Sequence, residues 1–479
     1  MKTRLRSGNG RPWRMLVAFG LALLLALLTV VRARSAEGAT LPPLVYAQRP
    51  CVSLRATPSA TGKLIATTIP GAGLRVTGLS SDGQWYHALF LGTLPIWVLA
   101  SDVATRYQTG LAEVEGCPFA DIPPYTAHPI TGTVGPFPLQ VTGTVTQYGE
   151  LHASAAPTAR VTAEITPGQR AYISQWAADT HGGIWYLAHV GENLGWLWAY
   201  TVILDGPDPA TATLANGQPV WSVAAGKGFW TTNYLPRHTD IPSLITAMKA
   251  LGITHIYPRV AETSFGFFDQ NTLDRLIPAA HAAGIKVIAW VYPYLRNVAD
   301  DLRMSQAVAN YHTPTGDHVD GIGADVEETT DAPAVFAYGQ VLRQMVGPQF
   351  PLVITTYSPH ARASYPFPEA AASFNVIAPQ DYWHYTATGT FDGQSARALL
   401  TVSVLGIRAE LGGKAFPIEE NGQMYDMFTY GEPGGSEPSA AEITGDLQTA
   451  KDLGLVGASF FDLRTASPDE LGALQQFAW

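Results

Sequence analysis

The sequence predicts a multidomain chain in which two small all-β barrels precede one large α/β barrel of the (β/α)8 type. Three observations support this prediction. The chain has 479 residues, 47% of them hydrophobic and 14% charged, so it can bury more than one core. Two segments before residue 205 repeat the same β-rich pattern. After residue 218, apolar β-runs alternate with amphipathic helical patterns.

Residues 1–40 have the pattern of a signal peptide or an N-terminal membrane anchor. Basic residues precede an apolar run from Met15 to Val31, and only Arg32 and Arg34 follow it closely. Because the more basic flank stays in the cytoplasm, we expect the rest of the protein to be extracytoplasmic. The run is longer than a usual signal-peptide core and short for a membrane span, so both a secreted and an anchored form stay open.

The chain beyond residue 34 is strongly acidic. It has 22 Lys+Arg against 39 Asp+Glu, a net charge of 22 − 39 = −17. Such a body is a poor candidate for nucleic-acid binding. We expect contact with the membrane only through the N-terminal segment, a monomer, no cofactor and no metal. The large barrel also lacks a GxSxG motif and a glycine-rich phosphate loop, which disfavours a serine hydrolase and a nucleotide site.

The two β-rich segments align along their length. Leu54-Arg55-Ala56 matches Leu151-His152-Ala153, Trp85-Tyr86 matches Trp185-Tyr186, and Trp97-Val98 matches Trp196-Leu197. Short β-runs separated by Gly, Asp and Ser are typical of small barrels. We expect domains at 41–118 and 141–205, a Pro-rich linker at 119–140, and a second linker at 206–218.

These motifs resemble those of bacterial Src-homology-3-like (SH3-like) domains, which have an LxxR-x-P-S segment, a central GxWYxV and a closing GWV. LRATPS, GQWYHA and IWV carry the resemblance in the first copy. LHASAAP, GIWYLAHV and GWLW carry it in the second, with His152 at the Arg position. The resemblance implies domains that bind cell-wall or peptide ligands or act as spacers. We expect Trp85 and Trp185 to be core residues.

Two cysteines, Cys51 and Cys117, flank the first small domain. In an exported chain this placement indicates a disulfide. Two unpaired buried thiols are the alternative.

Residues 219–479 carry the alternating pattern of the large barrel. Gly252, Gly284 and Gly454 follow helical patterns as C-terminal caps do, and Ser439 and Ser467 begin capping boxes. The alternation predicts a closed parallel sheet, with an open doubly wound sheet as the alternative. The expected strands are 227–234, 253–262, 285–295, 319–328, 352–359, 374–383, 414–422 and 455–464.

In a (β/α)8 barrel the functional site lies at the carboxyl ends of the strands. The stretch DGIGADVEE, residues 320–328, ends one strand and places Asp325 and Glu327 on the same face. Two close carboxylates repel, so one tends to stay protonated, as a general acid requires. Carboxylates ringed by aromatic residues are typical of a sugar site. The expected substrate-binding residues are Trp230, Arg259, Glu262, Trp290, Tyr292, Gln380, Asp381, Trp383, Glu420 and Asp462.

The segment DGIGADVE resembles the DGxDxDxE fourth-strand motif of family 18 chitinases, with Gly323 in place of the middle Asp. APQDYW is similar to the MxYD segment of that family, with Gln380 and Tyr382 matching and Trp383 in place of the Asp. Phe461 lies near the position of the family's strand-eight Trp. The DxE pair also resembles, more distantly, family 25 lysozymes, whose first-strand Asp is not evident here.

The resemblance implies an exported glycoside hydrolase that acts on peptidoglycan fragments or another polysaccharide containing N-acetylhexosamine. It implies that Glu327 protonates the glycosidic oxygen and that Asp325 restrains Glu327 or orients the N-acetyl group of the substrate. Tyr382 would hydrogen-bond that group. A double displacement, with Glu419 or Glu420 as nucleophile, is the alternative mechanism. A non-catalytic glycan-binding or scaffolding protein with a degenerate barrel is the alternative function.

Overall fold

A computed structural model describes residues 44–49, 52–68, 73–90, 94–105, 137–231, 240–359, 364–384, 392–425, 437–463 and 465–479. The expected signal or anchor, Cys51, Cys117 and most of the Pro-rich linker lie outside these residues. Within the described ranges no helix is long and apolar enough to span a bilayer.

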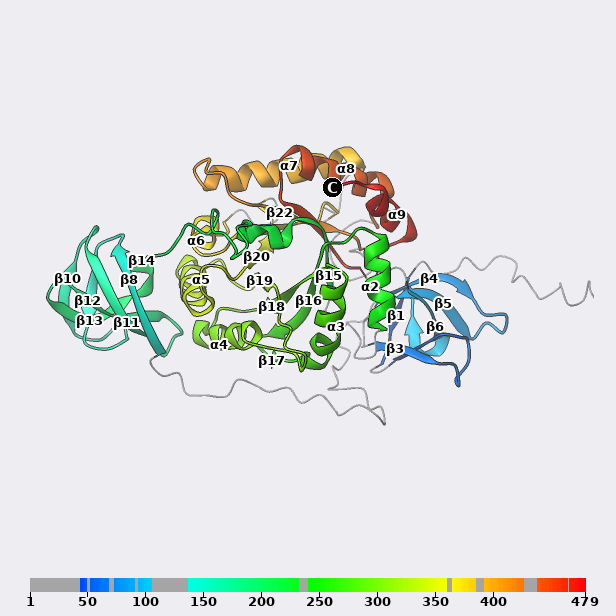
Figure 1. Cartoon of the computed structure of the whole chain (residues 1–479), viewed down its shortest axis with the longest axis horizontal. Helices are drawn as coiled ribbons and strands as arrows, with labels where there is room; N and C mark the ends of the chain where they lie inside the picture. The colour runs from blue at the N-terminus through cyan, green and yellow to red at the C-terminus, as the bar shows by residue number, and fades with distance from the viewer. Residues whose placement is uncertain are drawn as a thin grey trace, which may run out of the picture.

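Two seven-stranded antiparallel sheets precede the large barrel, one beside α2 and the other beside α5 (Figure 1). Their strand orders, β3-β2-β6-β5-β4-β1-β7 and β10-β9-β13-β12-β11-β8-β14, are identical when β1 is matched with β8 and each later strand with its counterpart. The sequence repeat is therefore a structural repeat. Trp85 and Trp185 are 7% and 4% exposed, which confirms them as core residues. The first sheet contains β1 (Leu44–Ala47), β2 (Val52–Arg55), β3 (Leu64–Thr68), β4 (Gly73–Leu79), β5 (Trp85–Phe90), β6 (Leu94–Leu99) and β7 (Val103–Ala104); the second contains β8 (Phe137–Val145), β9 (Gly149–His152), β10 (Val161–Ile165), β11 (Arg170–Ala178), β12 (Ile184–Val190), β13 (Asn193–Trp198) and β14 (Val202–Leu204).

The third sheet is a closed barrel of eight parallel strands, as the sequence predicts. Its order runs β15-β23-β22-β21-β20-β19-β18-β16, and pairing of β15 with β16 closes it. A short strand, β17 (Gly266–Phe267), pairs antiparallel with β16 outside the closed set. The barrel strands are β15 (Gly226–Thr231), β16 (His255–Glu262), β18 (Lys286–Tyr292), β19 (Gly321–Asp325), β20 (Leu352–Tyr357), β21 (Val376–Asp381), β22 (Glu419–Gln423) and β23 (Gly457–Phe461).

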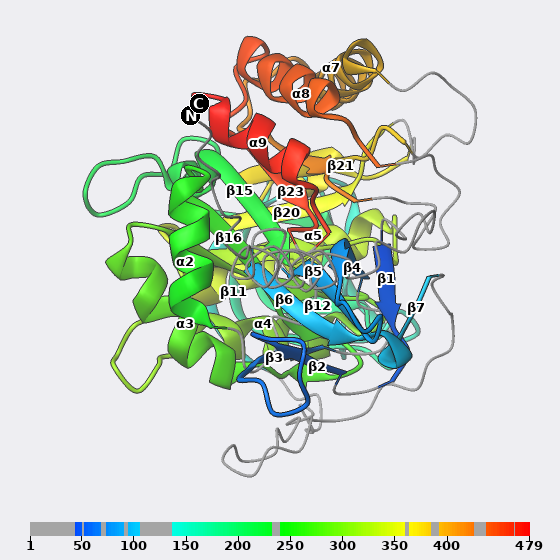
Figure 2. The same ribbon diagram turned by 90° about the vertical axis from the view of Figure 1, so that its right-hand side faces the viewer.

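A helix follows each barrel strand, so the chain forms a (β/α)8 barrel with its helices outside the strands. Figure 2 shows α7, α8 and α9 together on one side of the barrel. The capping boxes at Ser439 and Ser467 are present at the starts of α8 and α9. The helices are α2 (Ile241–Ala250), α3 (Gln270–Ala282), α4 (Val298–Ala309), α5 (Ala332–Val346), α6 (Phe367–Ala371), α7 (Gly393–Glu410), α8 (Ala440–Asp452) and α9 (Pro468–Gln476).

Candidate active site

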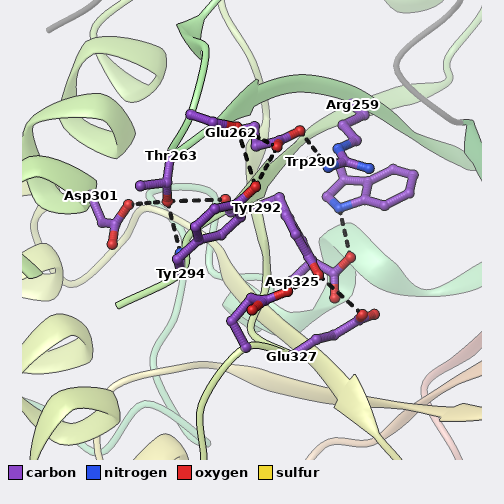
Figure 3. Close-up of polar contacts among 11 residues, drawn as sticks. Arg259, Glu262, Thr263, Trp290, Tyr292, Tyr294, Asp301, Asp325 and Glu327 are labelled. Carbon is purple, nitrogen blue, oxygen red and sulfur yellow. Dashed lines mark hydrogen bonds and ion pairs between the residues drawn. The ribbon is translucent and has the colours of Figure 1, made fainter. Parts of the chain in front are cut away.

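The carboxylates Asp325 and Glu327 lie at the carboxyl end of β19 and approach each other (Figure 3). Asp325 is 3% exposed, whereas Glu327 is half-buried. Gln380, from the end of β21, connects them, because its Nε2 donates to Asp325 Oδ1 at 3.1 Å and to Glu327 Oε1 at 2.5 Å. The sequence-predicted pair is therefore brought together with Gln380.

Two aromatic side chains from β18 complete the surroundings of this pair. Trp290 Nε1 donates to Asp325 Oδ2 at 3.0 Å. The Tyr292 hydroxyl lies 3.3 Å from Glu327 Oε2 and 3.4 Å from Glu328 Oε1. Because residues 290 and 292 are two apart on one strand, both side chains lie on the same face of the sheet. The expectation that Trp290 and Tyr292 lie at the site agrees with these contacts.

Burial favours the protonated form of Asp325. Burial raises the pKa of Asp325 well above its usual range, and the charge of Glu327 and a hydrogen bond with Glu327 raise it further. Arg259 and the Trp290 N–H act on this pKa in the opposite direction. Of the two neighbouring carboxyl groups, the half-buried Glu327 is the member that solvent and ligands can reach.

Gly323, the departure from the chitinase motif, is explained by the barrel interior. A Cβ at this position would lie 2.9 Å from Tyr257 Cδ1 and 3.3 Å from Trp230 Cη2. Trp230 is 1% exposed, and Tyr257 covers one of its faces with ring centroids 3.8 Å apart. Trp230 thus fills the space that an aspartate would need. It packs against the edge of Trp290 and supports the site from inside the barrel, with no free face for a sugar.

A second polar group lies beside the pair, at the ends of β16 and β18 (Figure 3). Arg259 Nη2 contacts Glu262 Oε2 at 2.6 Å, and the Arg259 guanidinium lies 4.6 Å from the centre of the Tyr292 ring. Glu262 also accepts hydrogen bonds from Tyr294 and Ser264, each at 2.6 Å. Arg259, expected at the site, packs against Trp290 and Tyr292, the two residues that contact the carboxylate pair. Glu262, also expected there, is held beside Arg259 by its ion pair.

Sequence reasoning missed three residues that shape the loop after β18. Thr263 donates to Asp301 Oδ1 at 2.5 Å, and Asp301 Oδ2 accepts from the Leu295 amide at 2.8 Å. Burial raises the pKa of Asp301 to about 6. Arg296 pairs with Glu328 at 2.9 Å, next to Glu327. An acid in the first turn of a helix usually indicates a cap, so the sequence carried no signal for the role of Asp301.

Tyr382 lies in an aromatic group with Phe461 and Tyr425. Its ring centre is 6.2 Å from that of Phe461 and 5.5 Å from that of Tyr425. Phe461 in turn contacts the edge of Trp290 at 6.1 Å. Tyr382 is therefore connected through the ring of Phe461 to Trp290, the residue that donates to Asp325.

Three other predicted residues, Trp383, Asp381 and Glu420, contact the outer helices or one another instead of this pair. Trp383 is 3% exposed and donates to Glu442 Oε1 of α8 at 3.1 Å. Asp381 and Glu420 point toward α8, where they cluster with Asp446, because Gln380 takes the inward position on β21. Asp462 is fully buried after β23. The geometry thus places Trp383, Asp381 and Glu420 between the barrel wall and its outer helices.

The strand-seven carboxylates are not placed for a double displacement. Glu419 is fully buried in the barrel interior, where it contacts His255 Nε2 at 2.7 Å and the Tyr257 hydroxyl at 2.5 Å. Glu420, on the other face of β22, approaches Asp381. Neither carboxyl group is available to attack a sugar beside Glu327.

Two of the strand-end residues, Tyr234 and Arg464, lie outside the described part of the chain. Within that part, no group of three or more His, Cys, Asp or Glu residues is arranged to hold a metal ion.

No family model and no curated protein matches the sequence. Solved structures do match. A class V chitinase from Pseudomonas fluorescens has a TM-score of 0.40 and 13% identity over 53% of this chain and 99% of its own. A chitinase from Chromobacterium violaceum has a TM-score of 0.41 and 12% identity over 53% and 98%. A spore cortex-lytic enzyme from Bacillus megaterium has a TM-score of 0.39 and 13% identity over 67% and 80%. At these TM-scores the likenesses carry no argument, and the barrel is established by the strand order of this chain.

Proposed function

We propose that the large barrel is a glycoside hydrolase that cleaves polysaccharides containing N-acetylhexosamine, such as cell-wall glycans. The observation that carries this proposal is the Asp325–Glu327 pair, which lies at the carboxyl end of β19 with Gln380 and Trp290 bonded to it. A proton that moves from Asp325 to Glu327 would give Glu327 what a general acid must donate. The aromatic residues around the pair suit the apolar faces of a sugar ring.

In this proposal Glu327 protonates the glycosidic oxygen as the bond to the leaving sugar breaks. The proton reaches Glu327 through its contact with Asp325, whose pKa is raised by burial and by the Glu327 charge. With Glu419 and Glu420 directed elsewhere, the acetamido oxygen of the substrate is the nucleophile that fits. Gln380, at the end of β21, and Tyr382, which follows that strand, would hydrogen-bond that acetamido group.

A non-catalytic glycan-binding barrel is the second candidate, favoured by one observation. Gln380 and Tyr292 both contact Glu327, so its oxygens are already engaged before any ligand arrives. In that case the same residues would bind an amide-bearing sugar without cleaving it.

Incubation of the purified chain with chitin oligomers and with peptidoglycan fragments separates the two candidates. A hydrolase generates new reducing ends from at least one of these substrates. Saturable binding without new reducing ends would support the binding module. If the chain shows no binding and no cleavage, both candidates are excluded.

We further propose that the two small domains are SH3-like modules that bind the cell wall. We also propose that the chain after residue 40 is extracytoplasmic, either secreted or anchored in the membrane by its N-terminal segment. The common strand order of the two sheets supports a shared fold. Protease treatment of intact cells should degrade the barrel.

We also propose a disulfide between Cys51 and Cys117. Two titratable thiols in the unfolded, unreduced chain would exclude it.

A further inference from the structure

The loop of residues 293–297, between β18 and α4, carries side chains that organise the site (Figure 3). Arg296 Nη2 contacts Glu328 Oε2 at 2.9 Å, and its guanidinium lies 5.3 Å from the centre of the Tyr294 ring. The Tyr294 hydroxyl donates to Glu262 at 2.6 Å. A displacement of this loop would therefore disturb both the Arg296–Glu328 pair beside Glu327 and the Tyr294–Glu262 hydrogen bond.

The barrel fixes one side of the loop. Thr263 Oγ1 accepts from the Tyr294 amide at 2.8 Å, and Asp301 accepts from the Leu295 amide at 2.8 Å. Leu295 has φ of 53°, and in the described part of the chain no other residue except glycine has a positive φ. A leucine adopts this conformation only where its surroundings impose it.

The other side of the loop is closed by the second small domain, residues 137–204. A Cβ at Gly182, in the turn between β11 and β12, would lie 2.7 Å from the Arg296 carbonyl oxygen and 3.3 Å from Asn297 Cα. Hydrogen bonds close the turn, because Asp179 accepts from the amides of His181 at 2.8 Å and Gly183 at 3.0 Å. Asp179 also accepts from Trp185 Nε1 at 2.9 Å, which connects the turn to the domain core.

Further contacts fix this domain against the barrel. The Tyr200 hydroxyl donates to Glu369 at 2.7 Å, and the Leu204 amide donates to Gln340 Oε1 at 2.9 Å. Strand β11 also lies against α4, the helix that the loop leads into. The turn thus lies against the Arg296 backbone, in a position that these contacts fix.

We propose that the second small domain positions the loop of residues 293–297 at the barrel site. Its Asp179–Gly183 turn sets the backbone at Arg296, and through it the Arg296–Glu328 pair and the Tyr294–Glu262 bond. Gly182 is a positioning residue: only a residue without a side chain allows the turn to approach the loop this closely. The consequence for catalysis rests on the proposed hydrolase function, whereas the consequence for the loop does not.

The test compares Gly182→Ala with Gly168→Ala in the full chain. Gly182 and Gly168 have nearly equal positive φ values, 85° and 87°, and lie in the same domain, but a Cβ at Gly168 has no atom within 4 Å. Both variants therefore strain the backbone alike, and only the first pushes on the loop. Hydrogen exchange measured by mass spectrometry reports the amides of 293–302, and kcat and KM report the site.

We expect Gly182→Ala to speed exchange at the Tyr294 and Leu295 amides about tenfold and to lower kcat/KM about tenfold, with Gly168→Ala like wild type in both. If Gly182→Ala does not fold, Asp179→Asn, which removes the acceptor for Trp185, should change exchange in the same direction. Equal exchange in the glycine variants would overturn the proposal, and changed exchange with unchanged kcat/KM would overturn its catalytic part. A wild-type chain without hydrolysis would refute the hydrolase function, while the exchange result would still decide the loop contact.

Discussion

At position 323 the barrel interior leaves no room for a side chain, since the stacked rings of Trp230 and Tyr257 occupy the space. The aspartate of the chitinase motif and this aromatic stack exclude each other. The site therefore has Asp325 and Glu327 but no acid at position 323, where the motif has its middle Asp, and Gln380 is bonded to both carboxylates.

The crowding predicts the cost of filling this space. Gly323→Ala should lower the free energy of unfolding by about 1–3 kcal/mol, because the new methyl group forces Tyr257 or Trp230 from its position. Urea unfolding measures this change. Gly472→Ala is the control, since a Cβ there meets nothing within 4 Å in α9. If both variants are as stable as wild type, the interior at Gly323 is looser than described.

The sequence predicted the residues of the carboxylate pair because strand periodicity alone places Asp325 and Glu327 on one face. The same periodicity could have shown that Gln380 and Asp381 do not both line the site. They are adjacent on β21, so when one side chain faces the barrel interior the other faces the helices. Arg296 and Asp301 had no such signal, because their roles depend on the path of the loop after β18.

Between the barrel wall and α8, the elements β21, β22 and α8 bring together Asp381, Glu420 and Asp446, all fully buried. Burial raises the pKa of Glu420 and of Asp446 well above their usual ranges, and the charges of the neighbouring carboxylates raise both further. Burial beside other carboxylates therefore favours the protonated forms of Glu420 and Asp446.

These raised pKa values predict a stability that falls with increasing pH. For a carboxyl group whose folded pKa exceeds its unfolded value, the stabilisation is complete below the unfolded pKa, near 4.5 for Glu420, and is lost as the pH rises through the folded pKa. Glu420→Gln removes this titration and leaves an amide that can donate to Asp381 and Asp446. At pH 8 the free energy of unfolding of the variant should exceed that of wild type by at least about 1.4 kcal/mol, the equivalent of one pKa unit.

Urea unfolding at pH 5 and pH 8 measures this difference, with Glu328→Gln, at an exposed carboxyl group, as the control. A Glu420→Gln variant that loses as much stability as wild type between the two pH values would show that Glu420 is ionised throughout.

Over the whole molecule, the second small domain and the barrel are joined by buried hydrogen bonds. Gln340 of α5 accepts from the Leu204 amide at 2.9 Å and donates to Ser373 Oγ at 2.7 Å. The sequence predicted both domains and all eight barrel strands from local patterns. It could not predict this contact, because nothing in the alternation of polar and apolar residues tells which helix a separate domain will meet.

We therefore expect the second small domain and the barrel to unfold in one thermal transition. Gln340→Ala leaves the Leu204 amide without its acceptor, which costs about 1–3 kcal/mol and should separate the transition into two. Gln344→Ala, which removes only a 3.5 Å contact at the surface, is the control. Calorimetry that finds two transitions already in wild type would contradict the coupling.

The most direct test of the proposed function is the rate at which Glu327→Gln cleaves a chitin oligomer that the wild-type chain cleaves. The amide keeps the shape and the contact with Gln380 but has no proton to donate, so we predict a 10²–10⁴-fold lower kcat with binding retained. Glu192→Gln, at an exposed carboxyl group of the second small domain, should stay close to wild type. Wild-type turnover by Glu327→Gln would contradict the assignment of the acid. Binding without cleavage by wild type and variant alike would show that the barrel is a binding module.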